Sequence, residues 1–270
     1  MALNNPVDLH LVSWNRPKMT ELVIRTITKN TKPENYRLIV FDNGSDRDVM
    51  NMLIDLHENG YIDELHLEPT NIGLERARQW LLLNSTESEY FICVDNDCLP
   101  PPMKEGLDWI DRLRELMDRY EDFAAIACRT QVLIGTGNIF EEADQTGDDL
   151  VEFPHPGGSL RIMRTASVRE VGGWDRDNPG RGAEERYICG KLRDAGYRTA
   201  FARDIRTLHL FGDRKQTQDK WGYADGMKPE DTGHNDVSHP ALEQGDDKEE
   251  TSLYAGNSLA EGYFNVNRSN

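Results

Sequence analysis

The fold is decided by the stretch Tyr90–Phe91–Ile92–Cys93–Val94–Asp95–Asn96–Asp97–Cys98–Leu99–Pro100. Its first five residues are apolar or aromatic, which is typical of a buried strand. Two carboxylates follow directly, and the prolines that begin at Pro100 end the strand. Because open α/β sheets bind ligands beyond the carboxyl ends of their strands, we expect Asp95 and Asp97 to face a crevice. Their oxygens suit Mg²⁺ or Mn²⁺, although an Asp-x-Asp alone is more often a solvated turn.

The composition is that of an ordinary globular protein. The 270 residues are 37% hydrophobic and 29% charged, enough for one large domain with a substantial core. No apolar run approaches the roughly 20 residues that a membrane span needs, and Met1–Pro6 has no signal-peptide core. We therefore expect a cytoplasmic protein without integral membrane association.

Charge and cysteine usage exclude some classes of function. A net charge of −17 repels phosphate at long range, which disfavours nonspecific adhesion to nucleic acid or anionic membranes. The four cysteines form no Cys-x-x-Cys pair, so neither a zinc knuckle nor a disulfide scaffold is indicated, and we expect buried, reduced thiols: Cys93, Cys98, Cys128 and Cys189.

Strand and helix patterns alternate over the first half of the chain. Strands are predicted at Val7–Ser13, Tyr36–Phe41, Ile62–Leu67 and Tyr90–Val94, with amphipathic helical patterns between them. This alternation predicts an α/β fold with a Rossmann-like, mostly parallel sheet and helices on both faces. The strands end in polar residues that can converge on one edge and form a nucleotide pocket: Asn15, Arg16, Asp42, Asn71, Asp95 and Asp97.

The second half is less regular. We expect strands at Ala124–Cys128, Gln131–Ile134, Gly158–Arg164, Arg198–Ala202 and Ile205–Leu210, and a helix at Ala183–Ala195. The acidic, Gly-rich segment Gly135–Pro156 is interpreted as a surface excursion near the acceptor side. Residues 1–215 are interpreted as one domain and residues 216–270 as an acidic tail, partly mobile and able to act as a lid or to bind a partner.

Six motifs together resemble the nucleotide-sugar glycosyltransferases of the GT-A fold, particularly the large inverting family 2. In chain order they are Ser13–Trp14–Asn15–Arg16, Asp42–Asn43–Gly44–Ser45, Asn71 and Gly73 with Ala77 and Arg78, the Asp95/Asp97 pair, Gly172–Gly173–Trp174–Asp175, and Glu184–Glu185 before Ala195–Gly196–Tyr197. His209 stands where the family has a histidine near its last strand. The resemblance implies that residues 1–215 form a catalytic domain.

The resemblance also implies how a donor is held. Ser13, Trp14, Asn15, Arg16, Asp42, Asn71, Gly73, Arg78, Asp95 and Asn96 would bind a nucleotide sugar. Mn²⁺ or Mg²⁺ would be held by Asp97 directly, by Asp95 through water unless that residue holds the ribose, and by His209. The alternative for His209 is a core histidine between strands.

An inverting mechanism needs a base that takes the proton of the acceptor hydroxyl. Glu185 fits this role, with Glu184 orienting hydroxyl groups or exchanging roles with it. The family usually has Asp at the position of Glu185, and two acids at a helix start are also what the helix dipole favours. By the same resemblance, Gly173, Trp174 and Asp175 would line the acceptor side, whereas Trp174 could equally be a core residue.

A UDP-sugar is the donor that the residues favour. Asp42 can accept from a uracil imide and Trp14 can stack on the ring, although Asp42 can also close an Asx turn. Arg16 and Arg78 could contact phosphate or sugar. Glycans, small molecules, proteins and hydroxylated bases in DNA stay open as acceptors.

Two other functions compete with glycosyl transfer. A sugar-nucleotide nucleotidyltransferase would need a Gly-rich triphosphate loop after the first strand, and Ser13–Pro17 contains no glycine. A relative that binds nucleotides or glycans without turnover stays an alternative, since Glu185 departs from the family pattern.

Overall fold

The computed structural model describes residues 6–132, 149–157, 160–175 and 184–209. The predicted tail at 216–270 and most of the predicted surface excursion lie outside these residues. In the described part, no helix is long and apolar enough to cross a bilayer.

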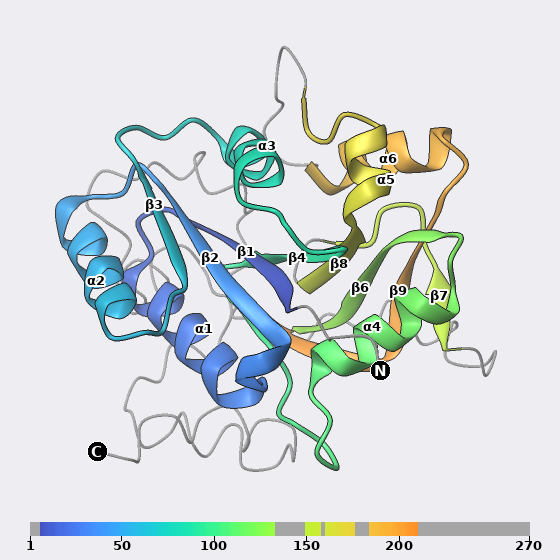
Figure 1. Cartoon of the computed structure of the whole chain (residues 1–270), viewed down its shortest axis with the longest axis horizontal. Coiled ribbons are helices and arrows are strands. Elements are labelled where there is room, and N and C mark those ends of the chain that lie inside the picture. The colour runs from blue at the N-terminus through green and yellow to red at the C-terminus, as the bar shows by residue number, and fades with distance from the viewer. Residues whose placement is uncertain (1–5, 133–148, 158–159, 176–183, 210–270) are drawn as a thin grey trace.

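Strands and helices alternate in the first half as predicted (Figure 1). Apolar residues at helical spacing form the helices of this half. Continuous apolar runs form the strands at Tyr36–Asn43 and Tyr90–Asp95, whereas apolar and polar residues alternate in those at Val7–Ser13 and Glu64–Glu68. The elements are β1 (Val7–Ser13), α1 (Pro17–Asn30), a 3-10 turn (Pro33–Asn35), β2 (Tyr36–Asn43), α2 (Arg47–Glu58), β3 (Glu64–Glu68), α3 (Leu74–Asn84) and β4 (Tyr90–Asp95).

The second half contains β5 (Cys98–Leu99), α4 (Trp109–Arg119), β6 (Phe123–Val132), β7 (Leu150–Glu152), β8 (Leu160–Arg164), α5 (Thr165–Glu170), α6 (Glu184–Asp194) and β9 (Arg198–His209). Two predictions were wrong here, because the four strands predicted within residues 124–134 and 198–210 are only two, β6 and β9. Where β6 pairs with β9, the register shifts between Phe123 and Ala125 and again between Ala127 and Arg129, and the ladder continues beyond each irregularity.

Nine strands of the described chain form one sheet, in the order β3-β2-β1-β4-β8-β6-β9-β5, with β7 paired to β9. The ladders among β1, β2, β3 and β4 are all parallel. The strand β8 is antiparallel to both β4 and β6, and β6 runs parallel to β9. The predicted α/β architecture is confirmed, with a parallel first half and a mixed second half.

Alternating side chains of the strands pack against two helical layers. Leu38 and Val40 of β2 belong to the core with α1, α2 and α4, whereas Ile39 and Phe41 pack against α3. In β4, Ile92 faces the first layer while its neighbours Phe91 and Cys93 face α3, α5 and α6. Figure 1 shows the two groups of helices on opposite sides of the sheet. A strand buried on both faces explains the unbroken apolar run in β4.

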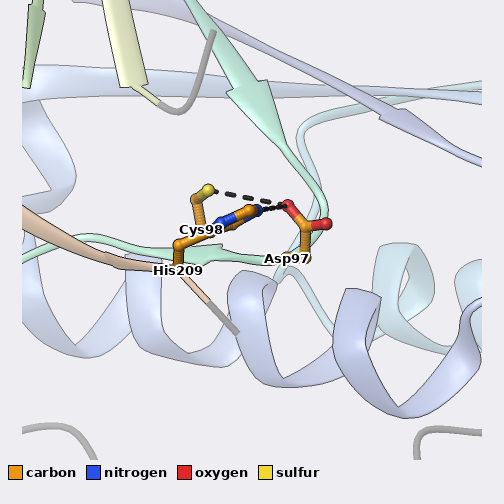
Figure 2. A group of neighbouring side chains, drawn as sticks. All are labelled: Asp97, Cys98 and His209. Atoms are coloured by element: carbon orange, nitrogen blue, oxygen red, sulfur yellow. Dashed lines mark hydrogen bonds and ion pairs between the residues drawn. The ribbon is translucent and has the colours of Figure 1, made fainter. Parts of the chain in front are cut away.

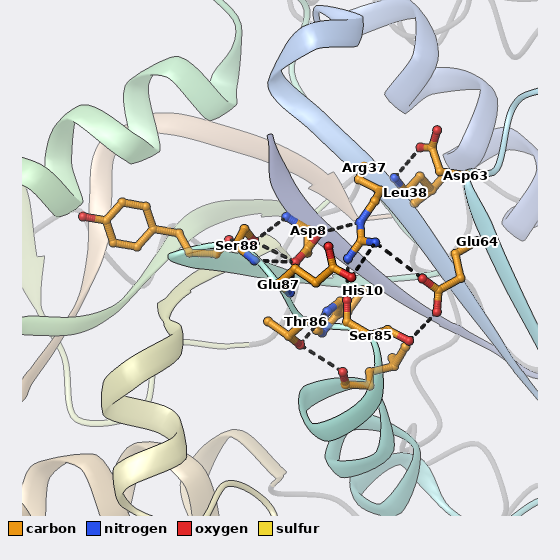
Figure 3. Close-up of polar contacts among 12 residues, drawn as sticks. Asp8, His10, Arg37, Leu38, Asp63, Glu64, Ser85, Thr86, Glu87 and Ser88 are labelled. Carbon is orange, nitrogen blue, oxygen red and sulfur yellow. Dashed lines mark hydrogen bonds and ion pairs between the residues drawn. The ribbon is translucent and has the colours of Figure 1, made fainter. Parts of the chain in front are cut away.

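A polar network joins strand starts at the amino end of the parallel sheet (Figure 3). Asp8 of β1 is buried and accepts from Arg37 of β2 at 2.8 Å, and its other oxygen accepts from the backbone N–H groups of Glu87 and Ser88. Burial alone would raise the pKa of Asp8, but these donors lower it overall. His10 stacks on Phe91, and burial lowers its pKa to about 3, so it is neutral. This end of the sheet is closed by its own side chains.

Parallel pairing brings the opposite strand ends together. Ser13 is in register with Asp42, which is also in register with Leu67 at the end of β3. On the other side of β1, Val12 is in register with Asp95. The polar residues that follow these strands therefore lie along one edge of the sheet.

Gly44 lets two of the loops at this edge touch. Its φ is +75°, and a Cβ there would lie 2.5 Å from the backbone nitrogen of Asn71 and still closer to the backbone carbon of Thr70. The loop after β2 therefore rests directly on the loop after β3. Any side chain at residue 44 would push the two loops apart.

We expect Gly44→Ala to destabilise the protein more than Gly60→Ala. Gly60 has almost the same φ of +76°, but open space surrounds its Cβ position, so alanine there costs only backbone strain of about 1 kcal/mol. At residue 44, overpacking adds about 1–3 kcal/mol. Urea unfolding of both variants measures the difference, and equal destabilisation would contradict the close approach of the loops.

Candidate active site

The loop after β1 is tied to the loop after β2. Asn15 has a positive φ of 47°, its backbone N–H donates to the Ser45 hydroxyl at 2.9 Å, and its side-chain oxygen accepts from the backbone N–H of Asp46 at 2.8 Å. Asparagine tolerates this backbone conformation better than most residues. The predicted donor residues Ser13, Trp14 and Asn15 therefore lie beside Asp42, with Trp14 partly exposed.

Asp42 accepts hydrogen bonds within the turn that follows β2, from Ser45 and not from Gly44. Its two oxygens accept from the backbone N–H of Ser45 at 3.0 Å and from the Ser45 hydroxyl at 2.5 Å. The carboxyl group is fully buried, and burial raises its pKa. The backbone donor is three residues on, at Ser45, and not two residues on, at Gly44, so the predicted Asx turn with Gly44 is not found among the described residues. Because the carboxyl group is buried, a contact between Asp42 and a nucleobase would require Asp42 to become exposed.

The loop after β3 is held by paired amides. Asn43 donates to the Asn71 side-chain oxygen at 3.0 Å and accepts from the backbone N–H of Ile72 at 2.9 Å. The same Asn71 oxygen accepts from the backbone N–H of Gly73, which is the N-cap residue of α3. Asn71 and Gly73 are thus held next to the Asp42 loop, with the Asn71 residue exposed.

Arg16, in the loop after β1, contacts the Asp-x-Asp segment that follows the neighbouring strand β4. Its Nη1 lies 2.8 Å from Asp97 Oδ2 and 3.2 Å from the side-chain oxygen of Asn96. Asn96 in turn donates to the Thr20 hydroxyl, which lies 3.3 Å from that of Ser13. These contacts join three of the predicted donor residues, Ser13, Arg16 and Asn96, to Asp97.

Asp97 contacts His209 and Cys98 through one carboxylate oxygen (Figure 2), and Arg16 contacts the other oxygen. Asp97 Oδ1 lies 3.3 Å from His209 Nε2 and 3.5 Å from Cys98 Sγ. Burial lowers the pKa of His209, but the Asp97 carboxylate raises it overall. A carboxylate oxygen and an imidazole nitrogen at this separation could hold one Mn²⁺ or Mg²⁺ ion, so Asp97 and His209 remain the candidate ligands.

Asp95 points to a different set of side chains. Its Oδ1 accepts from Arg78 Nη2 at 2.8 Å, and 35% of its side-chain surface is exposed. Desolvation by the surrounding protein raises the pKa of Asp95, and the nearby positive charge of Arg78 acts in the opposite direction. The structure therefore separates the two predicted acidic ligands: Asp97 lies in the group of close ligand atoms with His209, whereas Asp95 lies outside it.

Glu184 is anchored in a buried network. Its two oxygens lie 2.9 and 3.0 Å from Arg161 Nη2, the Trp174 indole N–H donates to Oε2 at 2.8 Å, and Arg78 approaches Oε1 to 3.4 Å. Burial would raise the pKa of Glu184, but the two arginines and the indole lower it overall. Both oxygens already accept charge-assisted or indole hydrogen bonds, so Glu184 is suited to fixing the positions of Arg161 and Trp174.

Glu185 differs from its neighbour in every contact. It occupies the first turn of α6 and is half-buried, and its side chain has no hydrogen bond or ion pair among the described residues. The oxygens of Glu185 lack the arginine and indole donors that occupy both oxygens of Glu184, so a hydroxyl group could approach them. Of the two predicted catalytic acids, Glu185 is the better placed for a base.

The predicted acceptor-side residues lie on the turn between α5 and α6. Trp174 is buried and packs edge-on against Phe91. It is therefore a core residue, which was the alternative to direct contact with an acceptor. Its backbone N–H donates to the Gln79 side chain at 2.7 Å, which holds the turn on α3. Gly173 accepts from Lys191 through its carbonyl, and Asp175 is exposed.

Sequence reasoning missed Arg161, Thr20 and the place of Cys98. Arg161 is a fully buried charge in β8 between Leu160 and Ile162, and a single charge inside an apolar strand is the signal that could have found it. Thr20 carries no such signal, because one hydroxyl in a helix is ordinary. Cys98 was interpreted only as a buried thiol.

The sequence matches a model of a known protein family. Residues 9–171 match the family described as Glycosyl transferase family 2, which is more than half of the chain. The chain belongs to glycosyl transferase family 2. No curated protein matches it significantly in sequence.

Solved glycosyltransferases share the fold of this family 2 chain. The mannosyltransferase PcManGT from Pyrobaculum calidifontis, in complex with GDP-Man and Mn²⁺, is 19% identical with a TM-score of 0.61, covering 77% of this chain and 57% of its own. GalNAc-T7 with UDP, GalNAc and Mn²⁺ is 15% identical with a TM-score of 0.66, covering 93% and 48%. S. aureus TarS 1-349 is 15% identical with a TM-score of 0.57, covering 76% and 60%. The chain thus spans about half to three fifths of these structures.

We expect substitution of Glu184 to lower the free energy of unfolding more than substitution of Glu185. Glu184→Gln leaves Arg161 and Arg78 buried without their carboxylate, which costs about 3 kcal/mol. Glu185→Gln removes a half-exposed charge near a helix start and costs less than about 1 kcal/mol. Denaturant unfolding of both variants tests this, and equal losses would refute the anchoring role of Glu184.

Proposed function

We propose that this chain transfers a sugar from a nucleotide-sugar donor to an acceptor hydroxyl group, with Mn²⁺ or Mg²⁺ and with inversion. The observation that carries the proposal is the convergence at one sheet edge of Asp97, His209 and Arg16 with Asp95, Arg78 and the Glu184 network. Family membership and the shared fold support the same reaction class.

The donor pyrophosphate would lie beside Asp97. Asp97 Oδ1 and His209 Nε2 would hold the divalent ion, while Arg16 keeps Asp97 Oδ2 fixed. When bound, the ion supplies Lewis-acid stabilisation of the negative charge that develops on the leaving phosphate. Asp95 would hold the ribose or bind the ion through water.

We propose Glu185 as the base and Glu184 as the group that positions it. Glu185 would take the proton of the acceptor hydroxyl as that oxygen attacks the anomeric carbon and the nucleoside diphosphate leaves from the opposite face. Glu184, held by Arg161 and Trp174, fixes the first turn of α6 and therefore the position of its neighbour. On the acceptor side, exposed Asp175 is better placed than buried Trp174 to contact the acceptor.

A UDP-sugar is the proposed donor. Trp14 is partly exposed next to the Asp42 turn and offers a ring on which uracil can stack. Asp42 keeps lone pairs beyond the two that Ser45 occupies, and these could accept from the uracil imide once Asp42 becomes exposed. The solved relatives were captured with GDP-Man in one case and UDP in another, so the nucleotide has to be tested directly.

The test is nucleotide release from a panel of UDP- and GDP-sugars with Mn²⁺, followed by mass spectrometry of candidate acceptors. We expect Glu185→Gln to slow release about 10²–10⁴-fold with nucleotide affinity unchanged, because a general base acts only in the transition state. Glu58→Gln, an exposed acid on α2, is the matched control and should be unaffected.

Other outcomes would identify the competing functions. Nucleotide binding without release in either protein would indicate a noncatalytic relative. Pyrophosphate release from a nucleoside triphosphate and a sugar 1-phosphate would indicate a nucleotidyltransferase. Full activity of Glu185→Gln would contradict the assignment of the base.

A further inference from the structure

Cys98 is placed beside the two proposed metal ligands by strand pairing. The short strand β5 runs antiparallel to β9 with Cys98 directly opposite His209, so the two side chains leave the sheet on the same face. Asp97 precedes Cys98 in the chain and turns its carboxylate to the same point (Figure 2). Ligand atoms of the three residues all lie within 4.8 Å of one another.

The two distances from Asp97 Oδ1 match those between ligands that share one ion, and His209 Nε2 and Cys98 Sγ lie within 4.8 Å of each other. Tetrahedral zinc with bonds of about 2.0 Å to oxygen and nitrogen and about 2.3 Å to sulfur keeps an oxygen about 3.3 Å from a nitrogen and about 3.5 Å from a sulfur. Asp97 Oδ1 lies 3.3 Å from His209 Nε2 and 3.5 Å from Cys98 Sγ. The oxygen in both contacts is the one opposite the oxygen that Arg16 holds.

We propose that Cys98 is a third ligand of this metal site, which therefore binds Zn²⁺ and Co²⁺ more tightly than Mg²⁺. Thiolate is a soft ligand that selects these ions over Mg²⁺, whereas a site of carboxylate, imidazole and water does not exclude magnesium. Binding converts the Cys98 thiol to a metal-bound thiolate and releases its proton to solvent. If these three residues of the described chain are its protein ligands, a fourth position is left, as in catalytic zinc sites, and a phosphate oxygen of the donor could fill it.

This inference rests on the metal role proposed above but can fail separately. If UDP binds only with Mn²⁺ but Cys98 does not contact the ion, the proposed function is supported and the assignment of Cys98 as a ligand is wrong. If the site binds no divalent ion, both fail. The experiment therefore needs a signal that reports sulfur in the metal shell and does not depend on turnover.

Cobalt absorption supplies that signal. We expect the full chain, titrated with Co²⁺, to show the near-ultraviolet charge-transfer band of a thiolate–cobalt bond at one equivalent. Cys98→Ser should still bind Co²⁺ through Asp97 and His209 but lose the band, and its Zn²⁺ affinity should fall at least about tenfold while its Mg²⁺ affinity changes less than about threefold. Cys189→Ser, a buried thiol on α6, is the matched control and should keep the band.

Three results would overturn the proposal. They are Co²⁺ bound to the native chain without a charge-transfer band, a band that survives in Cys98→Ser, and no Co²⁺ binding at all. Because the first and third are measured on the unaltered protein, a folding defect in the variant cannot hide them. Manganese-dependent UDP binding, measured on the same samples by calorimetry, reports the proposed function independently.

Discussion

The structure depends on the matching of three carboxylates with three buried arginines at one sheet edge. Asp97 faces Arg16, Asp95 faces Arg78, and Glu184 faces Arg161, each within hydrogen-bond distance. Asp95 ends β4 and Asp97 follows it, Glu184 begins α6, and Arg78 contacts both Asp95 and Glu184. Without nearby cations, the mutual repulsion and the desolvation of these acids would oppose folding. Such pairs contribute little net stability, but they fix positions, because removing one partner leaves an uncompensated buried charge.

This matching has a consequence for ligand binding. Three carboxylates and three guanidinium groups cancel, so these six groups supply no surplus positive charge to a nucleoside diphosphate, and the whole chain carries −17. A divalent ion between Asp97 and His209 would reverse that local balance. Nucleotide affinity should therefore depend on the ion much more than on any single arginine.

The sequence predicted the parallel half of the fold and the shared strand edge because both follow from local patterns. Apolar patterns marked β1, β2 and β4, and polar residues marked their ends. It did not predict the partners of the site residues, because Arg16 and Asp97, or Arg161 and Glu184, are brought together by topology and not by spacing. The core position of Trp174 and the pairing of Cys98 with His209 depend on the second half of the sheet. There, register shifts and mixed strand directions make strand pairing unpredictable from the pattern of apolar residues.

The most direct test of the metal-anchored site is calorimetry of UDP binding with Mn²⁺ and with the metal removed by EDTA, in the native chain and in Asp97→Ala. We expect measurable affinity only for the native chain with Mn²⁺, a difference of at least about tenfold, because the ion supplies the charge that the paired arginines do not. An affinity that is the same with and without Mn²⁺, and unchanged by Asp97→Ala, would contradict the account.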